Sequence, residues 1–335
     1  DVGDTYNWCP PDLDTVVDRP RAVTVTVTEA GPVRGVIVID TDHLLPERGG
    51  VDAEGRSVRT GELHQRVRTT LTLDAGEPFV RVTVELDQRA RDHRLRAHFP
   101  LARRTDHSTA ECAFALVRRP LHAEAGPNEW GVPTYPSRRF VRAGGVLIAH
   151  EGLCEYELVD LDGAADDQGT TAGALALTLV RATGWLSRGP MASRPLPAGP
   201  EDELLGAQTL TPLVLRYVVA VDPDEALDPY RLCDDAWSPL QVVESTGGGD
   251  LPARGSWLRM RGATVDALLP DDRGTGVGGV LMRVHEAEGR PGELVVEDRT
   301  GTVVDLTGAE LGPFDGRMAL RPHQIVTIRL DPPTI

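Results

Sequence analysis

Apolar and polar residues alternate along much of this chain of 335 residues. Residues 23–28 read VTVTVT, and this period of two places every valine on one face of an extended strand. The alternation recurs over residues 33–39, 67–73, 79–86, 175–180, 213–221, 279–284 and 325–330. No segment carries a long, capped apolar repeat of the helical period. The pattern therefore predicts a nearly all-β protein built from antiparallel sandwiches.

A glycine-rich stretch divides the predicted strands into two groups. Residues 245–250 read STGGGD, which is typical of a flexible joint. We expect a large β domain before this joint and a smaller β-sandwich after it. Residues 164–171 and 188–203 are predicted to be long loops, and such loops in compact β domains are usually functional or mobile.

The charge balance narrows the classes of partner. A net charge of −16 argues against nucleic acid and against an anionic membrane surface, because both would repel the protein. Neutral partners such as sugars stay open. The cysteines (Cys9, Cys112, Cys154 and Cys233) lie far apart and are expected to be free thiols. No apolar run approaches the roughly 20 residues of a membrane span, and no signal-peptide pattern is present, so we expect a cytoplasmic protein.

Metal-binding and nucleophile motifs are missing from the sequence. The nine histidines are scattered, so we expect no metal site within this chain. The sequence also lacks a Gly-x-Ser-x-Gly elbow and a phosphate loop, and the abundant acidic residues single out no catalytic pair. His93 is expected to be structural, and its neighbours Asp92, Arg94 and Arg96 are expected to pair across strands.

The scarce aromatic residues are the remaining candidates for binding a sugar. A sugar pocket needs an aromatic face or a phenol with a few convergent polar groups. The larger candidates are Tyr6, Trp8, Trp130, Tyr135 and Trp185. In a protein with so few aromatic residues, these are more often core anchors than ligands, so residue chemistry alone leads to a two-domain, all-β protein.

Seven stretches in order give a more definite picture. They are GDTYNWCPP (3–11), DHRLRAHFP (92–100), NEWGVPTYPSRRFV (128–141), GVLIAHEGLCEYEL (145–158), ALTLVRATGWLSR (176–188), AGPEDELLGAQ (198–208) and LRPHQIVTIRL (320–330). Together they resemble the C-terminal half of bacterial α-mannosidases of glycoside hydrolase family 38.

The resemblance implies an architecture and a role. In that family a zinc-containing barrel and a helical domain precede β-sandwich domains, of which the largest is a galactose mutarotase-like supersandwich. Residues 1–244 would form this supersandwich, with residues 1–20 entering from the barrel, and residues 251–335 would form the small sandwich. The chain would then be a noncatalytic part of a retaining, zinc-dependent glycosidase of mannose metabolism, inactive alone, with its barrel and helical domains as partners and an α-mannoside as substrate.

The resemblance also implies substrate-binding residues. Tyr6 matches a family tyrosine that reaches into the active site, where a phenol can donate or accept a hydrogen bond. Asp4 is expected to support Tyr6. Arg194, in the predicted loop, matches an arginine that lies against the substrate cleft. A purely structural role for Tyr6, packed at the interface with the barrel, is the alternative.

Two other functions are compatible with an all-β fold. A free-standing carbohydrate-binding module would expose Trp130 and Tyr135 on one surface. A mutarotase-like epimerase would need two histidines and a glutamate in one pocket, for which the spacing of His64, His93, His98 and His150 gives no support. If another domain normally covers one face, the chain is expected to expose an apolar patch and to form homo-oligomers.

Overall fold

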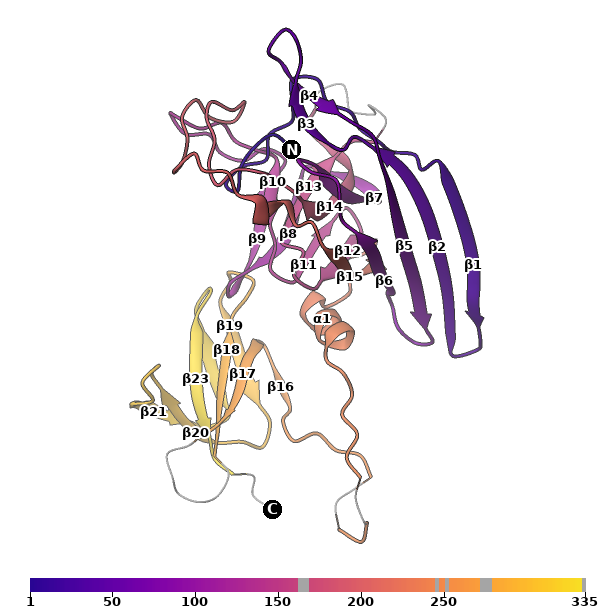
Figure 1. The fold of residues 1–335 in the computed structure, drawn as a ribbon. Coiled ribbons are helices and arrows are strands. Elements are labelled where there is room, and N and C mark those ends of the chain that lie inside the picture. Colours follow the sequence, from indigo (N-terminus) through magenta and orange to yellow (C-terminus); the bar gives the residue numbers. More distant parts are fainter. Residues whose placement is uncertain (162–168, 245–246, 251–252, 272–278, 333–335) are drawn as a thin grey trace. The chain divides into compact units, whose positions relative to one another are not determined.

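The computed structural model describes residues 1–161, 169–244, 247–250, 253–271 and 279–332 (Figure 1). The chain divides into two compact units. The first comprises Asp1–Ala110 and Arg118–Ser238, and the second comprises Glu111–Val117 and Pro239–Ile335. Parts of the predicted joint at 245–250 and of the predicted loop at 164–171 lie outside the described residues.

A nine-stranded sheet dominates the first unit (Figure 1). Hydrogen bonds connect its strands in the order β1-β2-β5-β6-β15-β12-β11-β8-β9. The bounds are β1 (Ala22–Ala30), β2 (Arg34–Leu45), β5 (Leu63–Asp74), β6 (Val80–Asp87), β15 (Pro212–Val221), β12 (Val146–His150), β11 (Phe140–Ala143), β8 (His107–Cys112) and β9 (Ala115–Pro120). Strands β1, β2, β5 and β6 are antiparallel neighbours; short turns join β1 to β2 and β5 to β6, whereas the hairpin β3–β4 lies between β2 and β5 in the chain.

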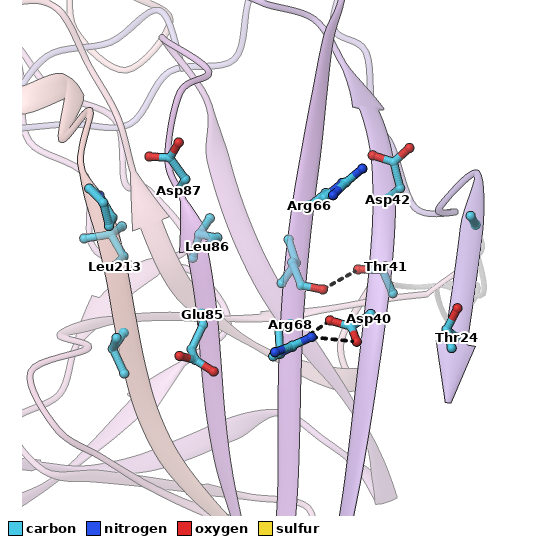
Figure 2. A pocket seen from close by; sticks show the side chains of 14 residues that line it. Thr24, Asp40, Thr41, Asp42, Arg66, Arg68, Glu85, Leu86, Asp87 and Leu213 are labelled. Atoms are coloured by element: carbon cyan, nitrogen blue, oxygen red, sulfur yellow. Dashed lines mark hydrogen bonds and ion pairs between the residues drawn. The ribbon is translucent and has the colours of Figure 1, made fainter. Parts of the chain in front are cut away.

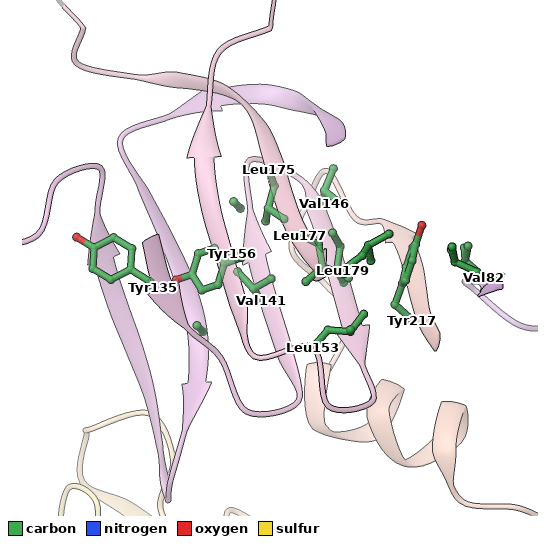
Figure 3. Close-up of a cluster of buried hydrophobic side chains, with 14 of the residues drawn as sticks. Val82, Tyr135, Val141, Val146, Leu153, Tyr156, Leu175, Leu177, Leu179 and Tyr217 are labelled. Carbon is green, nitrogen blue, oxygen red and sulfur yellow. The ribbon is translucent and has the colours of Figure 1, made fainter. Parts of the chain in front are cut away.

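A four-stranded sheet forms the second layer of this unit. Its order is β10-β13-β14-β7, with β10 at Thr134–Pro136, β13 at Glu155–Val159, β14 at Ala172–Arg181 and β7 at Arg94–Thr105. Apolar side chains from both sheets form one core, in which Tyr156, Leu175 and Leu177 are fully buried (Figure 3). Strand β14 is buried almost throughout, which explains its long apolar run.

The second unit has its own core and smaller sheets. One sheet has the order β16-β19-β22 (Met260–Arg261, Gly292–Val296 and Arg317–Leu320). The other has the order β17-β18-β23-β20-β21 (Thr264–Pro270, Val280–His285, Ile325–Leu330, Gly301–Val304 and Glu310–Phe314). Met282, Leu294 and Ile328 are fully buried at the centre of its core.

The all-β prediction is confirmed, with one α-helix in the described residues. All eight segments of alternating residues lie on strands of the structure. The helix α1 (Pro229–Trp237), the 3-10 turn η1 (Leu205–Gln208) and the hairpin β3–β4 (Arg48–Val51, Ser57–Thr60) were not predicted. No helix in the described part of the chain is long and apolar enough to cross a membrane.

Candidate functional site

Residues 1–9, which we call the entry segment, form a tight loop around the carboxylate of Asp1. This carboxylate accepts hydrogen bonds from the backbone N–H groups of Gly3 (2.9 Å) and Cys9 (3.2 Å). The N–H of Val2 donates to the carbonyl of Cys9, which closes the loop. A Cβ atom on Gly3 would lie 2.2 Å from the carbonyl oxygen of Asn7, so only glycine fits at this position.

Asp4 connects this loop to a distant one. Its side chain is fully buried and accepts hydrogen bonds from the N–H groups of Tyr6 (2.9 Å) and Asn7 (3.0 Å). It also accepts from the N–H of Arg188 (2.7 Å) and from the guanidinium of Arg194. The Arg194 side chain is itself buried, so this is an ion pair removed from water.

The loop that carries Arg194 is held in shape by its own contacts. Trp185 and Glu203 form a β-bridge at its base, and Met191 and Arg194 form another near its tip. Inside the loop, the hydroxyl of Ser187 accepts the N–H groups of residues 198 and 199 at 2.9 and 3.0 Å. These contacts fold the loop and hold Arg194 in a defined position.

Strand β14 leads into the loop that carries Arg194, and Arg181 and Thr183 at its end contact the N-terminal loop. The Nε of Arg181 lies 2.8 Å from the carboxylate of Asp1, and its Nη2 donates to the carbonyl of Asp4 at 2.5 Å. Burial lowers the pKa of Arg181 from its usual value. The Thr183 hydroxyl donates to the carbonyl of Gly3 at 2.9 Å. We call Asp1, Asp4, Arg181, Arg188 and Arg194 the entry clamp.

Tyr6 lies beside the entry clamp and is open to solvent. Its side chain is 56% exposed, and the guanidinium carbon of Arg194 lies 5.6 Å from the centre of its ring. This is within the range of a cation–π interaction. A Cβ atom built on Gly199 would lie 3.2 Å from the phenol oxygen, so the phenol lies along the loop that carries Arg194. The structure thus brings Asp4, Tyr6 and Arg194 together.

Trp8 is anchored on the other side of the entry segment. The guanidinium carbon of Arg94 lies 4.0 Å from the centre of a Trp8 ring, and Arg94 also pairs with Glu157 at 3.0 Å. Arg96 pairs with the same carboxylate at 2.6 Å. The predicted cross-strand pairing of these arginines is confirmed. The side chain of Asp92 instead accepts from the amide of Gln208 at 2.7 Å.

Asp1, Arg181, Arg188 and Ser187 were missed by reading the sequence. Arg181 ends the buried strand β14, and an arginine directly after an apolar run is an available signal for a buried ionic contact. The partner of Arg181 is more distant, since 177 positions separate it from Asp4. Sequence spacing cannot give such a pairing without the register of the strands.

The structure does not bring together the two aromatic residues on which the carbohydrate-binding alternative depends. Trp130 is exposed, whereas Tyr135 is buried and packs against Tyr156 at 6.2 Å between ring centres, so the two do not form one exposed aromatic surface. The histidines His64, His98 and His150 lie on β5, β7 and β12. Among the described residues, no group of three or more histidine, cysteine or carboxylate side chains is arranged to hold a metal ion.

A pocket of about 620 Å³ lies on the charged face of the large sheet (Figure 2). Residues of β1, β2, β5, β6 and β15 line it, and one row across these strands runs Thr24, Asp40, Arg68, Glu85 and Val214. Arg68 donates to both carboxylate oxygens of Asp40, at 2.8 and 3.1 Å. No residue of the entry clamp lines this pocket. The pocket offers charged groups without an aromatic face, which is an ordinary solvated sheet surface.

The fold and the entry clamp define an all-β region whose first residues are tied into a large antiparallel double layer. Comparison with known proteins identifies it further. Residues 2–146 match the family model "Glycosyl hydrolases family 38 C-terminal domain". Over this part, the chain thus matches the C-terminal domain region of glycosyl hydrolase family 38, and the resemblance seen in the sequence is confirmed.

Individual proteins are also similar to this chain. The chain is 25% identical over 283 residues to a protein of Halalkalibacterium halodurans named "Putative mannosylglycerate hydrolase", and the match covers 79% of this chain and 28% of that protein. An α-mannosidase from Enterococcus faecalis V583 has a similar fold, with a TM-score of 0.70, 20% identity and coverage of 92% of this chain and 35% of that one.

A second Enterococcus faecalis structure, a protein in glycosyl hydrolase family 38, gives the same result. Its TM-score is 0.68 at 20% identity, and the match covers 92% of this chain and 36% of that one. The chain spans about a third of the length of the proteins that it matches.

Proposed function

We propose that this chain is the noncatalytic C-terminal part of a retaining, metal-dependent α-mannosidase and completes the substrate cleft of the catalytic barrel. The observation that carries the proposal is the entry clamp. Its five charged residues connect the N-terminal loop to the loop that carries Arg194. Tyr6 lies between them with its phenol exposed. A fixed phenol can donate or accept a hydrogen bond at a sugar hydroxyl or a catalytic carboxylate.

Tyr6, Arg194 and Asp4 have different tasks in this proposal. Tyr6 is exposed and contacts the substrate or a catalytic group of the barrel. Arg194 is buried and paired with Asp4, so it acts as a positioning residue whose guanidinium packs against the Tyr6 ring. Asp4 fixes Arg194 and the backbone on both sides of Tyr6. Such a preorganised group costs little further ordering when the substrate binds.

The substrate class in this proposal is an α-mannoside. Two similar proteins support this class. One is named an α-mannosidase and the other a putative mannosylglycerate hydrolase, and both names refer to enzymes that act on glycosides of mannose. The carboxylate nucleophile and the zinc site belong to the region that precedes this chain in the longer polypeptide. When bound there, zinc would hold sugar hydroxyls as a Lewis acid. This chain would supply shape and the phenol.

The test compares hydrolysis by two proteins. One is this chain alone, and the other is the same chain with the coding region upstream of Asp1 restored; both are assayed with an aryl α-mannoside and with mannosylglycerate, each with added zinc. We expect activity only in the longer protein. Hydrolysis by the chain alone would contradict the proposal, as would a gene in which no catalytic region precedes Asp1.

A further inference from the structure

The entry clamp contains three arginines but only two aspartates. Arg181 pairs with Asp1 at 2.8 Å, and the buried Arg194 pairs with Asp4. Arg188 takes part through its backbone N–H, which donates to the Asp4 carboxylate at 2.7 Å. Within the described residues, the guanidinium of Arg188 forms no ion pair with a carboxylate. The clamp therefore carries one positive charge that no described carboxylate balances, and this charge lies on Arg188.

The guanidinium of Arg188 is oriented and still has donors available. Its Nη1 donates to the carbonyl of Val2 at 3.2 Å. Its central carbon lies 5.7 Å from the centre of a Trp185 ring, within the range of a cation–π interaction. A guanidinium has five N–H donors in one plane. The side chain is half-buried, and none of its nitrogens is buried without a partner, so the remaining donors face solvent.

Arg188 belongs to the same site as the exposed phenol of Tyr6. Both residues donate their backbone N–H to the carboxylate of Asp4, Tyr6 at 2.9 Å and Arg188 at 2.7 Å. The Nη2 of Arg194, whose guanidinium packs against the Tyr6 ring, lies 3.5 Å from the carbonyl of Arg188. A ligand that contacts the Tyr6 phenol therefore has the guanidinium of Arg188 as a neighbouring cation without a carboxylate partner.

We propose that Arg188 binds a carboxylate on the aglycone, the non-mannose part of the substrate. One unpaired guanidinium balances a single negative charge, which a carboxylate carries and a phosphate monoester exceeds at pH 7. The planar fork of a guanidinium also matches the two oxygens of a carboxylate. This inference rests on the proposed function and narrows its substrate class to α-mannosides with an acidic aglycone.

The test compares two substrates in the proposed longer polypeptide, in which a catalytic region would precede Asp1. One is mannosylglycerate, and the other is the same glycoside with a carboxamide in place of the carboxylate. We expect the unmodified protein to prefer the carboxylate. Arg188→Gln should lower kcat/KM for mannosylglycerate about tenfold to a hundredfold and change kcat/KM for the carboxamide by less than about threefold. The ratio of the two values does not depend on the amount of folded protein.

Two further variants sharpen this comparison. Arg188→Lys keeps the charge without the planar fork, so the preference for the carboxylate should fall less than in Arg188→Gln. Arg66→Gln is the matched control, because Arg66 is exposed on β5 and forms no ion pair within the described residues. This control should keep the preference of the unmodified protein.

The possible outcomes separate this inference from the proposed function. An equal loss for both substrates in Arg188→Gln would overturn the inference and assign Arg188 to the shape of the clamp or to a carboxylate of the preceding region. An unchanged preference in Arg188→Gln would also overturn it. Both results leave the proposed function intact. An unmodified longer protein that hydrolyses neither substrate nor an aryl α-mannoside would instead contradict the proposed function and the inference together.

Discussion

The outer edge and the interior of one sheet differ sharply in burial although they share one sequence pattern. A single row crosses the sheet through Val25, Ile39, Thr69, Val84 and Leu215. Val25 at the edge is 61% exposed, whereas Val84 in the interior is 3% exposed because it packs in the core beneath the four-stranded sheet. Both valines belong to equally regular alternations. Alternation therefore predicts a strand, but its apolar side chains are buried only where the second sheet packs against it.

The same contrast separates two arginine–aspartate pairs. The Asp4 and Arg194 side chains are 0% and 5% exposed, so their pair lies in the protein interior. The Asp40 and Arg68 side chains are 44% and 57% exposed on the charged face of the large sheet. Water screens the second pair and not the first. The contribution of an arginine–aspartate pair to stability in this protein thus depends more on how deeply the pair is buried than on which residues form it.

The largest expected effect comes from breaking the buried pair. Asp4→Ala leaves the guanidinium of Arg194 buried without its partner and removes the acceptor for three backbone N–H groups. We expect the free energy of unfolding to fall by about 3–5 kcal/mol, measured by urea denaturation. Asp40→Ala is the matched control on the exposed pair and should change stability little. Equal losses in the two variants would contradict the contrast.

A buried histidine in the interior should make stability depend on pH. Burial lowers the pKa of His150 from 6.5 to about 4. The unfolded chain therefore binds a proton between these values that the folded chain does not, so stability is lost as pH falls from about 6.5 to about 4. The contribution of His150 to this loss is about 3 kcal/mol.

Comparing His150→Gln with the wild type at pH 7 and pH 4 isolates this contribution. The variant should lose about 3 kcal/mol less than the wild type over this range, since glutamine takes up no proton. His64→Gln is the control, because His64 lies exposed on β5 at the edge side of the sheet. A wild-type pH dependence in the His150→Gln protein would show that the acid sensitivity arises from other groups.

The smallest expected effect tests the row of valines directly. Val84→Ala removes two methyl groups from a packed core and should cost about 2 kcal/mol in the free energy of unfolding. Val25→Ala removes the same groups from an exposed strand, and its cost should be a few tenths of a kcal/mol, measured at a concentration where the chain is monomeric. Comparable costs at both positions would mean that the edge is covered in solution.

Much of the fold was predictable because the strands carry strong local signals. Residues 23–28 and 79–86 alternate strictly, and they lie on β1 and β6 as predicted. The helix α1 was missed because it has only nine residues, although Asp228 caps it and Pro229 opens it. Short elements of this kind give too few periods for a pattern to stand out.

The candidate site was predictable only in part. The resemblance to family 38 pointed to Tyr6, Asp4 and Arg194, and the structure places these three together. The other clamp residues could not be predicted, since the contact between Arg181 and Asp4 joins positions 177 apart and depends on the register of β14. Local periodicity carries no information about such contacts, whereas a folded double layer fixes them.

The most direct test of the account is the kinetic effect of Tyr6→Phe in the proposed longer polypeptide, in which a catalytic region would precede Asp1. Phenylalanine keeps the ring beside Arg194 and removes only the hydroxyl group, so the stability of the chain should not change. Trp130→Phe is the control at another exposed aromatic residue. We predict that kcat/KM for an α-mannoside falls about tenfold to a hundredfold in Tyr6→Phe and not in the control. An unchanged kcat/KM in Tyr6→Phe would contradict the claim that this chain completes the cleft through Tyr6.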